Sequence, residues 1–368
     1  MANNNENKIL NVPNLRFPEF SGEWVTKSIN DLAVVIGGGT PDTTVKSYWD
    51  GEIQWFTPSE IGKNKYVDSS LRTITEVGLN NSSAKLLPPN TILLSSRATI
   101  GECSLSLREC ATNQGFQCLV SKKCNVDFLY YLIQTKKKDL IRKSCGSTFL
   151  EISANEVRKI QVSVPSDVEQ QKIAELLSLI DERIATQNKI IDKLKSLIKG
   201  IDEVVFQSCS KHCKLKEFDN QITAGRDKVE EGCFPLYGST GVIGTTATPS
   251  YHEPLVLVAR VGSIGCVQFV NIPCGVSDNT IVIRCGSKAK YVYYYLQNYN
   301  FERITSGTTQ PLITAKDVKH IDIPIIDSAN DLKAINTLDT LNMKLELESN
   351  LYNTILKQKA FLLQQMFI

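Results

Sequence analysis

Two long stretches of the chain repeat apolar residues with a heptad period. From Glu169 to Phe206 one polar residue, Gln187, interrupts ten seam positions, and no glycine or proline breaks the pattern before Gly200. Ser166 and Glu169 have the spacing of a capping box at the start of this stretch. The pattern predicts a long helix of the coiled-coil type, roughly 55 Å in length at about 1.5 Å per residue.

A second seam, weaker than the first, runs from about Asp331 to Phe367, with Glu348 and Lys359 at seam positions. Two such seams in one chain most simply pair with each other, in either direction; the alternative is that each helix packs only on its own domain. The predicted seam residues are Leu177, Ile180, Ile184, Ile191, Leu194 and Ile201 in the first helix and Leu338, Leu341, Leu345, Tyr352, Ile355 and Leu362 in the second.

The second half of the chain repeats the first at an offset of 161 residues. GSTFLEISANEVRKI from Gly146 aligns with GTTQPLITAKDVKHI from Gly307 with six identities in fifteen positions, and the two seams align in the same register. A repeat of this length is the size of a domain. The chain is therefore expected to be a tandem of globular unit, long helix, globular unit and long helix, with an approximate twofold relation.

Short apolar runs bounded by turn residues fill the stretches before each helix. The predicted strands are Thr91–Ser95, Gln117–Val120, Leu255–Ala259, Val267–Val270 and Thr280–Arg284, and the predicted short helices are Val126–Thr135 and Lys290–Asn298. This mixture predicts an α+β fold with two similar mixed α/β domains. The expected boundaries are a mobile tail over 1–14, a first domain over 15–165, a helix over 166–207, a second domain over 208–327 and a helix over 328–368.

Composition narrows the class of protein. No run of eighteen apolar residues occurs, so no membrane span is expected, and the eleven scattered cysteines without any CxxC pair indicate reduced thiols in a cytoplasm. Cys209, His212 and Cys213 lie close together, but nothing nearby completes a four-ligand zinc site. A net charge of +2 does not identify a nucleic-acid binder, so a DNA-binding chain of this composition would have to concentrate charge locally or share the work with partners.

Catalytic motifs are missing from the sequence. HExxH, GxSxG, GxGxxG and Walker sequences do not occur, and all three histidines lie in the second half, so a duplicated active site is not indicated. The matching loops SSRATIG from Ser95 and ARVGSIG from Ala259 pair Arg97 with Arg260. The next matching loops pair Asn113–Gln114 with Asp278–Asn279, residue types that either read base edges or stabilise tight turns.

Three segments resemble a known family: PNLRFPEFSGEW from Pro13, GGGTPDTTVKSYWDGEIQWFTPSEI from Gly37 and VEQQKIAELLSLID from Val168. They are similar to the specificity subunits of type I restriction–modification systems, and the likeness covers nearly the whole chain. The second helix departs from it, because NDLKAINTL stands where the first helix opens with EQQKIAELL.

The resemblance implies a non-catalytic subunit with two target-recognition domains, each reading one half of a bipartite site in double-stranded DNA. An antiparallel coiled coil would set the spacer and dock two methyltransferase subunits, which restriction and translocase subunits would join. S-adenosylmethionine, ATP and Mg would be bound by those partners and no cofactor by this chain. Polar and basic loop residues are the candidate DNA contacts: Thr57, Ser59, Lys63, Lys65 and Arg97 in the first domain, and Arg226, Lys228, Tyr237, Ser239 and Arg260 in the second.

Two other classes of function fit parts of the pattern. A scaffold whose coiled coil spaces two domains that bind ligands other than DNA agrees with every periodicity. A solitary enzyme is disfavoured, because the catalytic residue types are not duplicated along with the domains.

Overall fold

The computed structural model describes residues 10–146, 150–207, 211–217, 221–307, 311–325 and 329–368. It divides into two compact units, residues 1–188 with 351–368 (unit 1) and residues 189–350 (unit 2). The long helices α6 (Asp167–Gln207) and α9 (Ala329–Gln365) each contribute one part to unit 1 and the other part to unit 2.

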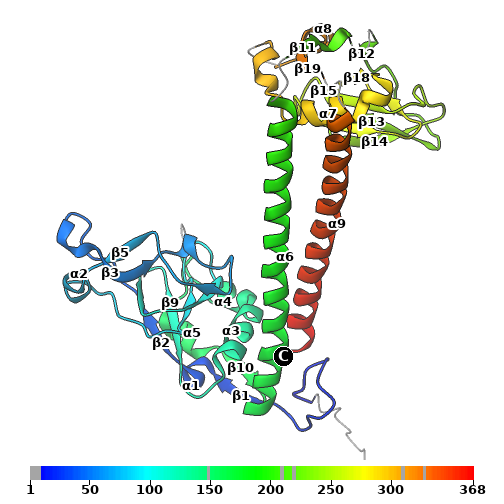
Figure 1. The fold of residues 1–368 in the computed structure, drawn as a ribbon. Helices are drawn as coiled ribbons and strands as arrows, with labels where there is room; N and C mark the ends of the chain where they lie inside the picture. The colour runs from blue at the N-terminus through cyan, green and yellow to red at the C-terminus, as the bar shows by residue number, and fades with distance from the viewer. Residues whose placement is uncertain (1–9, 147–149, 208–210, 218–220, 308–310, 326–328) are drawn as a thin grey trace, which may run out of the picture. The chain divides into compact units, whose positions relative to one another are not determined.

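Unit 1 contains a mixed domain built on two sheets and a strand pair (Figure 1). One sheet has the order β2-β9-β6-β7-β4, the other has the order β5-β3-β8 with β3 and β8 parallel, and β1 pairs with β10. Its strands are β1 Val25–Ser28, β2 Ala33–Gly37, β3 Trp49–Phe56, β4 Tyr66–Val67, β5 Arg72–Ile74, β6 Ile92–Leu94, β7 Cys103–Ser106, β8 Cys110–Thr112, β9 Gln117–Ser121 and β10 Gln161–Val164. Its short helices are α1 Ile29–Leu32, α2 Glu76–Asn80, α3 Val126–Thr135, α4 Lys137–Arg142 and α5 Ala154–Lys159.

Unit 2 repeats this plan with fewer additions. One sheet has the order β12-β18-β15-β16, the other has the order β14-β13-β17 with β13 and β17 parallel, and β11 pairs with β19. The strands are β11 His212–Lys214, β12 Ile222–Ala224, β13 Phe234–Gly238, β14 Gly241–Thr246, β15 Leu255–Ala259, β16 Val267–Val270, β17 Gly275–Val276, β18 Thr280–Ile283 and β19 Asp322–Pro324. The short helices are α7 Ala289–Gln297 and α8 Ala315–Lys319.

The strand orders of the two units correspond element by element. The run β2-β9-β6-β7 matches β12-β18-β15-β16, and β5-β3-β8 matches β14-β13-β17 down to the one parallel pair. The α+β class and the two similar domains expected from the sequence repeat are thus confirmed. The seven predicted short elements are also confirmed, with ends that differ from the observed ones by at most a residue or two.

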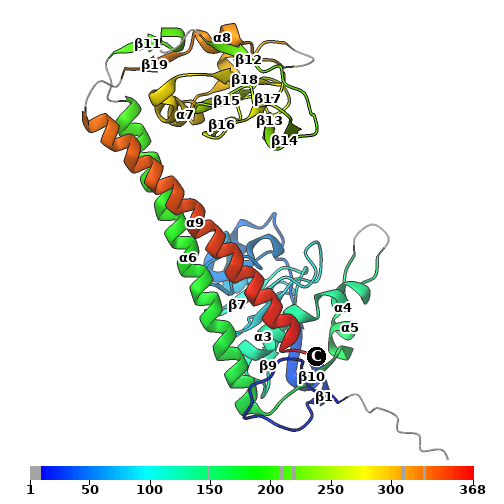
Figure 2. The ribbon, with the colours of Figure 1, turned by 90° about the vertical axis from the view of Figure 1, so that its right-hand side faces the viewer.

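The two long helices pack on each other, and they run antiparallel (Figure 2). In unit 1, Leu177 near the start of α6 shares a core with Leu362 and Met366 near the end of α9. In unit 2, Val205 near the end of α6 shares a core with Leu338 near the start of α9. Each helix also packs on the domain that precedes it, so the two packing alternatives that the sequence left open both occur.

The heptad seam is visible in the exposure of the side chains. Leu177, Ile191, Leu194, Leu338 and Ile355 are buried. Ile180, Ile184, Ile201, Leu341, Leu345, Tyr352 and Leu362 are partly buried. Gln187 is buried at its seam position.

The start of α6 differs from the predicted capping box. The Ser166 hydroxyl accepts a hydrogen bond from the Glu169 amide at 3.4 Å, which is the expected half of the motif. The Glu169 carboxylate instead accepts hydrogen bonds from Arg16 and from the Trp24 indole. A long-range ion pair has replaced the local contact, because Arg16 offers the buried carboxylate two charged donors.

Candidate nucleic-acid interface

Three chain segments meet at one edge of the domain in unit 1. Because β3 and β8 are parallel, the residues that follow them lie together, and the amide of Asn113 donates to the carbonyl of Phe56 at 3.1 Å. The turn between β6 and β7 joins them through the Ser96 amide, which donates to the Gly115 carbonyl at 2.8 Å. The end of β3, the β6–β7 turn and the β8–β9 turn thus form a cluster, called here loop cluster 1.

The corresponding three segments meet in unit 2. The amide of Ser277 donates to the carbonyl of Tyr237 at 2.9 Å, and the amide of Arg260 donates to the carbonyl of Asn279 at 3.1 Å. The Ser239 hydroxyl lies 3.3 Å from that same Asn279 carbonyl. The β13–β14, β15–β16 and β17–β18 turns form loop cluster 2, which has the same origin in the topology as loop cluster 1.

The candidates that follow β3 have different environments. Thr57 and Glu60 form a capping box, and the Thr57 hydroxyl lies 3.0 Å from that of Ser59. Ser59 and Lys63 are exposed. The Lys65 side chain, by contrast, is only 6% exposed and pairs with Asp127 at 2.6 Å, so it is not placed for contact with DNA.

Arg97 and its equivalent Arg260 both touch neighbouring loops. Arg97 forms an ion pair with Glu151 at 2.9 Å in which both side chains are more than a third exposed. The Arg260 guanidinium donates to the carbonyl of Asp278 at 3.4 Å. Both arginines thus hold neighbouring turns together, and both side chains remain partly exposed.

Two further candidates in unit 2 flank Asp227 in the chain. Arg226 and Lys228 are exposed on either side of it, while the Asp227 carboxylate accepts hydrogen bonds from the Val276 amide and the Ser250 hydroxyl. Tyr237 is half buried in a small apolar cluster, and this burial raises the pKa of its phenol. The loop of Arg226 and Lys228 is therefore anchored at its centre and presents its two cations outward.

The paired polar residues of the β8–β9 and β17–β18 turns separate into two roles. The Asn113 side chain accepts a hydrogen bond from the Gly115 amide at 2.9 Å and so stabilises its turn. Gln114 and Asn279 are exposed. Gln114 accepts a hydrogen bond from Thr40 at 2.5 Å, and Thr40 belongs to the glycine-rich segment after β2. The sequence alone does not indicate this contact, because only the fold brings Thr40 beside Gln114.

The glycine-rich segment packs tightly against loop cluster 1. A Cβ on Gly38 would lie 2.0 Å from the Asn113 carbonyl oxygen, and one on Gly39 would lie 2.2 Å from the Ser83 hydroxyl. The Gly39 amide donates to the Thr112 carbonyl at 2.8 Å. Glycine is required here for close backbone approach, which makes the segment a structural support of the cluster.

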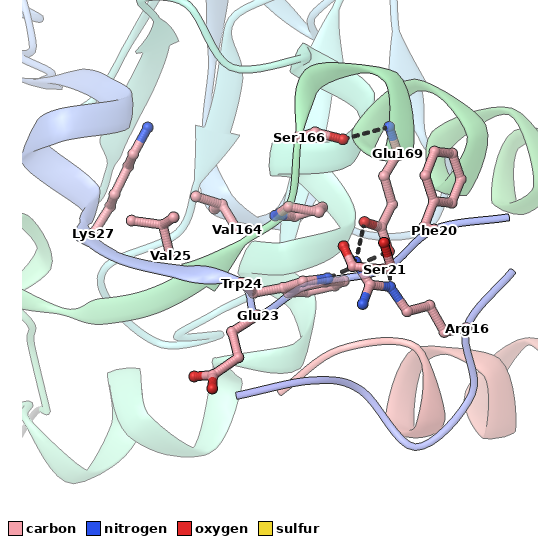
Figure 3. Close-up of a pocket in the computed structure, with 11 residues that line it drawn as sticks. Arg16, Phe20, Ser21, Glu23, Trp24, Val25, Lys27, Val164, Ser166 and Glu169 are labelled. Carbon is pink, nitrogen blue, oxygen red and sulfur yellow. Dashed lines mark hydrogen bonds and ion pairs between the residues drawn. The ribbon is translucent and has the colours of Figure 1, made fainter. Parts of the chain in front are cut away.

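A cavity of about 300 Å³ lies beside the first turn of α6 in unit 1 (Figure 3). The Glu169 carboxylate at its edge is held by two hydrogen bonds of 2.7 Å from Arg16 and one of 3.3 Å from the Trp24 indole. This group, called here the clasp, joins two of the segments that carry the family resemblance. The carboxylate raises the pKa of Arg16 through its hydrogen bond.

The clasp also orders the segment before β1. The side chain of Asn11 donates to the carbonyl of Trp24 at 2.6 Å, and the amide of Leu15 donates to the carbonyl of Gln365 at 2.9 Å. Residues 10–14 of the predicted tail therefore contact the domain, and residues 1–9 lie outside the described part of the chain.

Neither a metal site nor a membrane span is found in the described ranges of the chain. No group of three or more His, Cys, Asp or Glu side chains placed to hold a metal ion occurs among those residues, and Cys209 lies outside them. None of the helices in those ranges is long and apolar enough to cross a membrane.

Comparisons with known proteins agree with the duplicated plan. The family model described as the type I restriction modification DNA specificity domain matches residues 21–196 and 213–357. The MjaIX specificity subunit of Methanocaldococcus jannaschii is 39% identical over 180 residues, which are 47% of this chain and 42% of that protein. The EcoprrI specificity subunit of Escherichia coli is 23% identical over 362 residues, which are 87% of this chain and 88% of that protein.

A solved structure shows the same fold. The S subunit of a type I restriction-modification system from M. genitalium superposes with a TM-score of 0.69 over 97% of this chain and 99% of that chain, at 20% identity. The matched segment spans less than half the length of two of the curated relatives, 42% of the MjaIX subunit and 43% of the EcoR124I/EcoR124II subunit.

Proposed function

Because this chain belongs to the type I restriction–modification DNA specificity family, we propose that it reads a bipartite sequence in double-stranded DNA. Each domain reads one half-site, and the two long helices set the separation between the half-sites. The observation that carries the proposal is the recurrence of one loop cluster, from equivalent turns, in both units. Two linked readers bind a bipartite site more tightly than either binds its half-site, since the second binds at high effective concentration once the first has docked.

We assign the two readers to residues 15–165 and 208–327 and the helical segments to 166–207 and 328–368. The proposed contacts to bases and phosphates are the exposed or partly exposed loop residues Thr57, Ser59, Lys63, Arg97, Arg226, Lys228, Ser239 and Arg260. Arginine and lysine supply phosphate contacts and bidentate contacts to guanine, and the hydroxyls supply shorter hydrogen bonds. Tyr237 is a weaker candidate for a DNA contact because its side chain is half buried. Lys65 is not proposed as a DNA contact, because its ammonium group pairs with Asp127 within the protein.

We further propose that the chain is non-catalytic and works with methyltransferase subunits that dock on the long helices, and with restriction and translocase subunits. Ile190, Leu197 and Val204 lie seven residues apart on α6, outside the seam, and their side chains are exposed. Exposed apolar residues at heptad spacing are suited to packing against a further helix. S-adenosylmethionine, ATP and Mg would then be held by these partners, whose basic groups would add to the small net charge of this chain.

A reducing cytoplasm is the compartment that suits this assignment. The proposed ligand, DNA, lies in that compartment. The ten cysteines in the described part of the chain form no disulfide with one another, which agrees with a reducing environment.

The experiment that tests the proposal is methylation mapping in cells that express this chain with its methyltransferase subunits. We expect methylated adenines within one bipartite motif, and Arg260→Ala should relax or abolish only one half-site. A change at both half-sites would contradict independent readers. A gel shift with randomised duplexes and methyltransferase subunit separates this function from the alternative scaffold, which would select no sequence.

A further inference from the structure

A chain of polar contacts ties the first domain to both long helices within unit 1. The Tyr131 hydroxyl, on the domain helix α3, donates to the Asp181 carboxylate on α6 at 2.7 Å. The other oxygen of that carboxylate pairs with Lys359 on α9 at 2.7 Å. The Lys359 and Asp181 side chains are 17% and 15% exposed, so this pair is largely removed from solvent.

Lys65 extends the same chain of contacts from a loop of the domain. Its ammonium group donates to the Ser178 hydroxyl on α6 at 2.7 Å and pairs with Asp127 on α3. The ammonium groups of Lys65 and Lys359 lie 4.9 Å and 5.6 Å from the centroid of the Tyr131 ring. Two cations and two carboxylates therefore balance around one tyrosine, and their hydrogen bonds fix the angle at which α3 meets α6 and α9.

Unit 2 contains a corresponding set of contacts made by different residues. The Tyr294 hydroxyl, on the domain helix α7, donates to Asp339 on α9 at 3.0 Å, and Lys290 pairs with the same carboxylate. The other long helix is reached by Asn298, whose amide donates to Asp202 on α6 at 3.1 Å. In both units a tyrosine of the domain helix thus bonds an aspartate on the long helix that follows the domain in sequence.

We propose that Tyr131, Asp181 and Lys359 are positioning residues that set the orientation of the first reader on its helix pair and so select the spacer length of the DNA site. This inference rests on the proposed function. Adjacent base pairs are about 3.4 Å apart along the duplex. A small rotation of the domain about this contact shifts its loops by about this distance, which places them on a neighbouring base pair. The three residues lie in the helix contact and outside loop cluster 1, so they affect the distance between half-sites and not the bases read.

The test uses the full chain with its methyltransferase subunits and a DNA library in which the two mapped half-sites are separated by the wild-type spacer or by one base pair more or less. Methylation is counted by sequencing. Lys359→Met should raise the ratio of methylation at the altered spacers to methylation at the wild-type spacer by about tenfold. This is a fraction of the roughly 10²–10⁴-fold gain in affinity that two correctly spaced binding sites give over one. Both half-site sequences should stay the same.

Three further variants keep the result decisive. Tyr131→Phe removes one hydroxyl and keeps the ring, so it should show a smaller effect in the same direction even if Lys359→Met folds poorly. The exchanged pair Asp181→Lys with Lys359→Asp rebuilds the ion pair but removes the carboxylate that accepts from Tyr131, so its effect should be smaller than that of Lys359→Met. Lys357→Met, at an exposed position of the same helix, is the matched control and should change nothing.

The outcomes separate the inference from the proposed function. Wild-type spacer preference in Lys359→Met and Tyr131→Phe would overturn the positioning role, and so would an altered half-site sequence or an exchanged pair with as large an effect as Lys359→Met. A wild-type chain that directs methylation to no bipartite motif would overturn the proposed function itself.

Discussion

Replacement of Arg16 by methionine should strongly destabilise unit 1, because it leaves the Glu169 carboxylate buried without its cation. The Glu169 side chain is 2% exposed, and the two ion-pair hydrogen bonds measure 2.7 Å. Removing one partner of a buried ion pair costs about 3–5 kcal/mol. The Trp24 indole alone, at 3.3 Å, cannot compensate the charge.

The same two segments provide a matched control. Lys172 on α6 pairs with Glu19, but these side chains are 46% and 43% exposed, so Lys172→Met should cost about 1 kcal/mol or less. Both variants remove one positive charge from the same region. The main difference between them is whether the carboxylate that remains is in contact with water, since Arg16 also donates to the carbonyls of Ser21 and Gly22 and Lys172 lies over the rings of Phe17 and Phe20.

The assay is urea unfolding followed by tryptophan fluorescence. All three tryptophans, Trp24, Trp49 and Trp55, belong to unit 1, so the signal reports this unit. At a slope of about 2 kcal/mol per molar urea, Arg16→Met should lower the midpoint by about 1.5–2.5 M. The double variant Arg16→Met with Glu169→Met should recover much of this loss, because neither charge then remains buried.

A midpoint for Arg16→Met no lower than that of Lys172→Met would refute the reasoning. So would a double variant whose loss equals the sum of the two single losses, since that would mean that the two charges do not interact.

The remaining predictions concern packing, thiol ionisation and backbone approach. Leu338→Ala should lower the free energy of unfolding by about 2–5 kcal/mol and Met343→Ala by about 0.5 kcal/mol or less, since only Leu338 is buried; equal melting temperatures would count against this packing. Burial raises the pKa of Cys103 from 9.0 to about 12, so its thiol should resist alkylation at pH 8 while exposed Cys145 reacts, as mass spectrometry can show. Because the folded pKa is the higher one, the stability contributed by this thiol is present below pH 9 and is lost as the pH rises to about 12; unchanged stability over that interval would contradict it. Gly39→Ala should distort loop cluster 1 and weaken recognition of the half-site read by the first domain, without changing recognition of the other half-site. Wild-type methylation of sites that carry the first half-site would show that the segment tolerates a Cβ.

Local sequence pattern predicted the elements well and the roles of charged residues less well. The predicted ends of α3, β15 and β16 match the observed ends, since each depends on neighbours within a few residues. Lys65 was a candidate DNA contact because it follows a strand in a polar loop. Its partner Ser178 lies 113 residues away in sequence, so no local pattern indicates that its ammonium group is engaged.

The direction of the helix pair and the role of its charged seam residue could not be predicted from local sequence pattern either. The heptad pattern allowed either direction, and the choice of antiparallel came from the family resemblance. Lys359 weakened the second seam as a sequence pattern, whereas in the fold it pairs with Asp181 and lies over the Tyr131 ring. The structural role of a charged residue at a seam position depends on the residues that face it.

The sequence by itself determined the repeat, the two heptad helices and the mixed class of the domains, because periodicity and turn residues act over a few neighbouring positions. The tertiary structure alone decided which polar groups face one another. Arg16 and Glu169 lie 153 residues apart, and burial makes their contact a clasp. Parallel pairing of β3 with β8 and of β13 with β17 likewise gathers the turns of each loop cluster, since strands that run in one direction end at one edge.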